Sequence, residues 1–160
     1  MKRIKELETL SWEHHDGLVV AFRLQKGLQN KADLQIMKNY LLETWENALT
    51  HHFWQEEETL VTTLQNNSAG RDLLKQMKEQ HTFFHNLIEK LRKQQGDVGE
   101  MLASFADRLN SHIRFEERQL FPFIEQNASQ QELRLIGFFL HSHHRKDNKK
   151  CTPQFWKTIT

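Results

Sequence analysis

The chain has 160 residues, and 22 Lys and Arg against 21 Asp and Glu give it a formal net charge of +1. A charge near zero, with both signs interleaved, gives no electrostatic reason to expect a nucleic-acid partner. The single cysteine cannot form an internal disulfide, the N-terminus lacks the apolar run of a signal peptide, and no apolar run could span a bilayer, so we expect a cytoplasmic protein without membrane contact.

Helix-forming residues dominate the chain, and 6 Gly and 2 Pro leave few breaks. Apolar residues recur at helical spacing, without the clear alternation that is typical of strands. Breaks at 65–70 and 96–99 interrupt the apolar stripes. The pattern predicts four main helices and a fifth C-terminal one, over about residues 11–29, 32–64, 71–93, 100–126 and from 129 onward.

Local signals mark the ends of these helices. Ser11 suits the N-cap of the first, and Ser129 with Glu132 forms a capping box for the fifth. Pro122 removes a backbone donor and should kink or fray the end of the fourth. Because short turns join long amphipathic helices, we expect an all-α, antiparallel up-down-up-down four-helix bundle over residues 1–128, with an additional C-terminal helix in 129–160 that extends the same domain.

One ten-residue frame occurs twice, sixty residues apart, in the second and fourth predicted helices. It places His52 four residues before Glu56, and His112 four residues before Glu116. Residues four apart share a helix face and lie about 6 Å apart along the axis, so each copy presents an imidazole beside a carboxylate. Both pairs continue an apolar stripe, where a carboxylate is costly unless it is paired or binds a metal.

The third predicted helix repeats this spacing with two imidazoles, His81 and His85. Three such pairs predict a metal site built from helices. A ferritin-like site needs Glu-x-x-His, and a metalloprotease needs His-Glu-x-x-His; neither occurs, and cysteine is too scarce for a thiolate site. A site of histidines and two carboxylates suits iron, and also manganese or zinc.

Several polar residues near these pairs fall off the apolar stripes. His51 lies about a quarter-turn away from the stripe that carries His52. Glu57, Glu58 and Glu117 are expected to be solvated. The second histidine cluster, in the fifth predicted helix, has no carboxylate at the shared spacing and is expected to be exposed; it consists of His141, His143 and His144.

With these motifs in this order, the chain resembles the hemerythrin-like (HHE cation-binding) domain proteins over about residues 11–126. In that family, five histidines and two bridging carboxylates hold two non-haem irons, joined by an oxo or hydroxo group. The resemblance implies one further ligand from the first helix: His15, on the apolar stripe of Leu18 and Phe22, with His14 as the rival. The implied ligand set is His15, His52, Glu56, His81, His85, His112 and Glu116.

Five histidines, two bridging carboxylates and a bridging oxygen fill all but one of about twelve positions around two octahedral irons. We therefore expect a binding protein that binds or senses O2, NO or cellular iron. The alternatives are an enzyme that handles peroxide or NO, a donor of iron for repair of damaged centres, and a helical interaction protein with a vestigial or zinc-filled site. The sequence names no protein partner, oligomeric state or role for residues 129–160.

Overall fold

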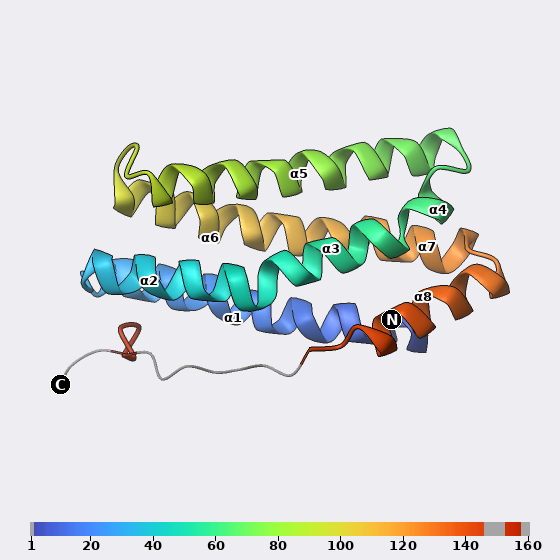
Figure 1. The fold of residues 1–160 in the computed structure, drawn as a ribbon, viewed down its shortest axis with the longest axis horizontal. Helices are drawn as coiled ribbons and strands as arrows, with labels where there is room; N and C mark the ends of the chain where they lie inside the picture. The colour runs from blue at the N-terminus through green and yellow to red at the C-terminus, as the bar shows by residue number, and fades with distance from the viewer. Residues whose placement is uncertain (1, 146–152, 158–160) are drawn as a thin grey trace.

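The computed structural model describes residues 2–145 and 153–157, and every regular element in this part of the chain is helical. The predicted all-α class is confirmed. The long helices lie lengthwise beside one another, and α8 lies at the end where α7 finishes (Figure 1). In chain order the elements are η1 (Lys5–Leu7), α1 (Glu8–Gln29), α2 (Leu34–Thr44), η2 (Trp45–Leu49), α3 (Thr50–Thr59), α4 (Val61–Leu64), α5 (Ser68–Arg92), α6 (Val98–Phe115), η3 (Glu116–Leu120), α7 (Phe121–Asn127) and α8 (Gln130–Ser142).

Side-chain caps begin most of the long helices. Asp33, Asn67 and Asp97 each accept a hydrogen bond from the backbone N–H three residues on, at the starts of α2, α5 and α6. The predicted capping box of Ser129 and Glu132 at α8 is present. Ser11 is not an N-cap: α1 begins earlier, after the 3-10 turn η1, and has no side-chain cap.

Two π-helical segments interrupt the helices that carry the repeated frame. In η2 the N–H of Thr50 donates to the carbonyl of Trp45, and in η3 the N–H of Phe121 donates to that of Glu116. Pro122 follows directly and has no N–H to continue the ladder. The helix nevertheless runs on through α7 to Asn127, directly after the π-helical segment η3, so its end is not frayed at Pro122.

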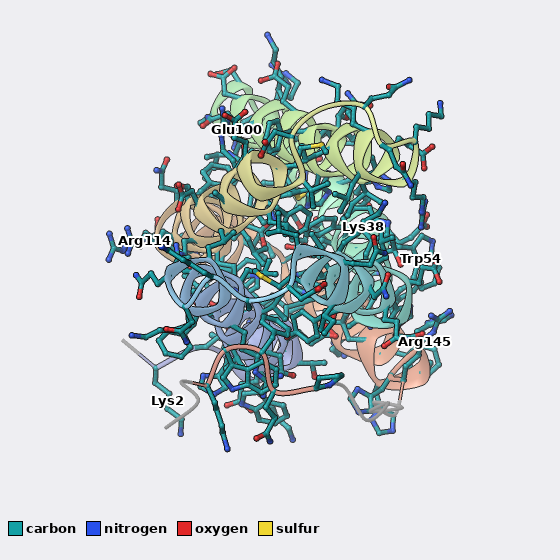
Figure 2. All side chains as sticks on the ribbon, turned by 90° about the vertical axis from the view of Figure 1, so that its left-hand side faces the viewer. Lys2, Lys38, Trp54, Glu100, Arg114 and Arg145 are labelled. Atoms are coloured by element: carbon teal, nitrogen blue, oxygen red, sulfur yellow. The ribbon has the colours of Figure 1, made fainter. Side chains whose placement is uncertain are left out.

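A polar layer divides the apolar core into two clusters. On α1, Leu10 belongs to one cluster and Val20 to the other; on α5, Met77 and Phe84 are divided in the same way. Charged side chains such as Glu100 and Arg114 instead point away from the bundle (Figure 2). Within the described residues, no helix is both long and apolar enough to cross a membrane.

The C-terminal region packs against the bundle at both ends. From α8, Leu133, Ile136 and Leu140 complete one of the two core clusters. Farther on, Phe155 packs against the other cluster, with its ring centroid 5.1 Å from that of Tyr40. Both parts therefore have a packing role that the sequence did not indicate.

Gly70 allows α5 to pass close to the end of α4, because a Cβ at this position would lie 2.1 Å from the carbonyl oxygen of Leu64. We expect Gly70→Ala to lower the free energy of unfolding by about 1–3 kcal/mol, since backbone must move to make room. Gly137→Ala in α8 is the control, because its nearest neighbour is the flexible side chain of Glu6 at 3.3 Å. Urea unfolding of both variants checks this. Equal stability of Gly70→Ala and the wild type would contradict it.

Candidate metal centre

Six buried side chains from the long helices meet in the polar layer between the core clusters. None of these residues is more than 5% exposed as a whole, and both glutamates are fully buried. Along the chain, they lie between residues of one apolar cluster and residues of the other. They are His14 of α1, His52 and Glu56 of α3, His81 of α5, His112 of α6 and Glu116 of η3.

These residues form two overlapping groups of possible metal ligands. One group combines His14 and His52 with the two glutamates, and the other combines His81 and His112 with the same glutamates. Within each group the ligand atoms lie within 4.8 Å of one another. Glu56 and Glu116 belong to both groups, so the two groups share their carboxylates and differ in their histidines.

The Nε2 atoms of the histidines point toward these carboxylates. The Nε2 of His52 lies 3.0 Å from Oε1 of Glu56, and that of His112 lies 2.6 Å from Oε1 of Glu116. The Nε2 of His81 lies between the two glutamates, 3.6 Å and 3.7 Å from their Oε1 atoms. All potential ligand atoms therefore converge on one small volume.

The opposite ring nitrogen, Nδ1, is held by an outer acceptor in each histidine. Carboxylate and amide oxygens only accept hydrogen bonds, so Nδ1 carries the proton and Nε2 is left to bind a metal. Each acceptor comes from the element next to that of its histidine, and together they close a ring around the bundle. The pairs are Glu13 with His52 at 3.1 Å, Glu57 with His81 at 2.8 Å, Gln80 with His112 at 2.6 Å and Glu117 with His14 at 2.8 Å.

Several buried nitrogen and oxygen atoms of the centre lack a hydrogen-bond partner, which is also consistent with a metal site. Among the described residues, the buried side-chain N and O atoms without a hydrogen-bond partner all belong to this centre, apart from Nε of Arg3. The three imidazole nitrogens among them lie 2.6–3.7 Å from glutamate oxygens but make no hydrogen bond of good geometry with them. Such close, poorly aligned contacts between buried polar atoms need an explanation, and atoms that are directed at a metal provide one. The atoms are His52 Nε2, His81 Nε2, His112 Nε2, both oxygens of Glu56 and Oε1 of Glu116.

In the metal-free centre, burial and the nearby carboxylates have opposite effects on the histidine pKa values. Burial favours the neutral imidazole, but Glu56 and Glu13 outweigh it and raise the pKa of His52 to about 10. For His81, burial is again outweighed, by Glu116, Glu56 and Glu57, and the pKa rises to about 11. Protons therefore occupy these histidines in the metal-free protein, and a metal must displace them.

Two of the predicted ligands lie outside the centre. His15 is exposed, and the predicted α1 stripe is wrong because Leu18 and Phe22 are 40% and 54% exposed. The rival His14 lies in the centre, on a buried face that continues through Gly17, Ala21 and Leu24. This face is hard to recognise because glycine and alanine carry little hydrophobic signal.

His85 is exposed as well, and its ring meets the edge of Trp45 at a centroid distance of 4.8 Å. Phe84 takes the buried position next to it. The structure thus gathers four histidines where five were expected, while His52, Glu56, His81, His112 and Glu116 do come together.

The outer acceptors were the residues that sequence reasoning missed. Glu57 and Glu58 are exposed as predicted, whereas Glu117 is half-buried. Glu57 and Glu117 each nevertheless accept a hydrogen bond from a histidine of the centre. Each outer acceptor directly precedes or follows a residue of the centre in the sequence, which is a signal that the sequence does contain. His51 lies outside the centre, where its Nε2 is 2.8 Å from the carbonyl of His143. The second histidine cluster, His141, His143 and His144, is exposed as predicted.

The fold and this buried centre define an all-helical protein whose histidines and glutamates are able to hold a metal. The chain belongs to the hemerythrin family: residues 7–124 match the model of the hemerythrin HHE cation binding domain. No curated protein and no solved structure matches the chain. The resemblance noted from the sequence is thereby confirmed.

The two neighbouring histidines of α1 give a direct test of the site. We expect His14→Ala to reduce the metal content of the purified protein, because it removes one of two imidazoles in its group, whereas His15→Ala should leave the content unchanged. His85→Ala should also bind metal like the wild type. Elemental analysis of the three variants measures this. A larger loss from His15→Ala than from His14→Ala would contradict the ligand assignment.

The raised histidine pKa values predict how metal-free stability depends on pH. The unfolded chain releases the proton of His52 near pH 6.5, whereas the folded chain holds it to about pH 10. Between these values the folded state binds more protons, so stability is greatest below pH 6.5 and falls as the pH rises. Thermal unfolding of chelated protein between pH 6.5 and 9 checks this. A melting temperature that rises over the same window would contradict it.

Proposed function

We propose that this protein binds two non-haem irons within an antiparallel up-down-up-down four-helix bundle, and that the centre binds or senses a diatomic ligand, O2 or NO. The observation that carries the proposal is the pair of ligand groups that share Glu56 and Glu116. Imidazole with carboxylate is a ligand set that suits iron, and the family match supports a cation at this place.

The number of ligands leaves room for a small molecule. Each group offers two imidazoles and an oxygen from each shared carboxylate. An octahedral iron has six positions, so a bridging oxygen leaves one more at each metal. With four histidines, the centre would thus expose one position on each iron, rather than the single position expected from a five-histidine set.

The surroundings favour binding over catalysis. The ring of Phe121 stacks on His14 at 5.0 Å, and that of Phe53 stacks on His81 at 4.1 Å, so apolar walls enclose the ligands. Tyr40, the sole tyrosine, has its contacts with Arg23 and the C-terminal segment. General acid–base assistance contributes about 10²–10⁴-fold. Within the described part of the chain, no lysine or tyrosine makes a hydrogen bond to the six side chains of the centre, which supports binding rather than turnover.

Metal analysis and rapid mixing test this function. We expect about two irons per chain after anaerobic loading, from the two ligand groups. Mixing the reduced protein with O2 or NO should give an adduct in the absorbance spectrum that decays by dissociation or autoxidation. His112→Ala should lose much of the signal, and His15→Ala serves as the matched control.

Other outcomes would overturn the proposal. No more than one metal per chain would rule out the di-iron centre. Sustained turnover of peroxide or NO, near ordinary enzyme rates of about 1–10³ per second, would favour the enzyme alternative. Transfer of iron to a damaged centre, without a gas adduct, would favour the iron-donor alternative.

A further inference from the structure

The ring of outer acceptors contains one member without charge. Glu13, Glu57 and Glu117 are carboxylates, whereas Gln80 is an amide. Gln80 accepts the hydrogen bond of His112, so the uncharged acceptor belongs to the group of His81 and His112. Both histidines of the other group, His14 and His52, are held by carboxylates.

An acceptor's charge changes how strongly an imidazole binds a metal. A carboxylate at Nδ1–H draws the proton toward itself and makes Nε2 a better donor, and its negative charge also attracts the cation. An amide oxygen orients the ring in the same way but adds no charge. His112 is therefore well oriented yet a weaker ligand than its three counterparts.

Other charges near the ring reinforce this difference. Glu57 is 42% exposed in its side chain, so water screens its charge, and Lys78 acts on it as well. Glu13 lies in a less exposed position, with a side chain 26% exposed. Glu117 is paired with Arg3, but Arg3 also binds Glu125, so this trio keeps a net negative charge.

From this asymmetry we infer that the two metal positions are unequal, and that Gln80 makes the position of His81 and His112 the weaker, more readily vacated one. The inference rests on the proposed two-metal centre and deepens it. Gln80 acts through His112 and touches no metal, so it is a positioning residue. The stronger position, at His14 and His52, fills first and keeps its metal longest.

The test is a titration of metal-free, full-length protein with Co²⁺ alone, followed by its absorbance and by calorimetry. The wild type should show two binding steps of different affinity. Gln80→Glu restores a carboxylate and should tighten the weaker step by about 10-fold or more, the size of effect that outer hydrogen-bond partners have on metal sites. A substitution that merely damaged the fold would weaken binding, so the direction of the change is diagnostic.

Gln76→Glu is the matched control, because it adds the same charge to the exposed surface of α5 one turn away. It should shift neither step by more than about threefold, as for other exposed charges. Two further variants assign the steps to positions. Glu57→Gln should weaken the second step, and Glu13→Gln should weaken the first.

Each failure has a distinct meaning. Two steps that do not respond to Gln80→Glu, or that respond equally to Gln76→Glu, would overturn the role of Gln80. Weakening of the same step by Glu13→Gln and Glu57→Gln would overturn the assignment of positions. A single binding step in the wild type would overturn this inference together with the two-metal function.

Discussion

The ring of imidazole hydrogen bonds is the interaction on which the rest of this structure depends. Two carboxylates and four imidazoles lie between two apolar clusters, where an unpaired charge would cost several kcal/mol. Each histidine is held at Nδ1 by a residue of a neighbouring element, so the same hydrogen bonds fix both the orientation of the imidazoles and the packing of the helices. A rotation of any long helix would break two of these bonds at once: the one its histidine donates and the one its acceptor receives.

Residues far from the centre keep this ring in place. Arg3 donates to both the carboxylate and the backbone carbonyl of Glu117, at 2.7 Å and 2.9 Å, and Glu117 in turn holds His14. In the π-helical register the N–H of residue 122 would donate to that carbonyl, but Pro122 has no N–H, so the carbonyl can accept from Arg3 and anchor the N-terminal segment. The π-turns and Arg3 are thus part of the centre's architecture, although none of them supplies a ligand atom.

Sequence periodicity could predict the ligands that lie on strong apolar stripes, and little beyond them. His52 and Glu56 share one helix face by spacing alone, and so do His112 and Glu116, so each pair follows from helix geometry. His14 was ranked below His15 because the buried face of α1 contains Gly17 and Ala21, and such small residues give only a weak apolar pattern in the sequence. His85 lies outside the centre because the rotation of α5 about its axis buries Phe84 instead, and packing against other helices determines that rotation. The hydrogen bonds to the outer acceptors also depend on packing, because each one joins two neighbouring elements.

The central claim is that four histidines and two shared glutamates enclose two metals. Anomalous diffraction from crystals of the iron-loaded protein tests it most directly. The account predicts two anomalous peaks about 3.5–4 Å apart, each between Glu56 and Glu116, with one beside His14 and His52 and the other beside His81 and His112. A single peak, or a peak bound by His15 or His85, would contradict it.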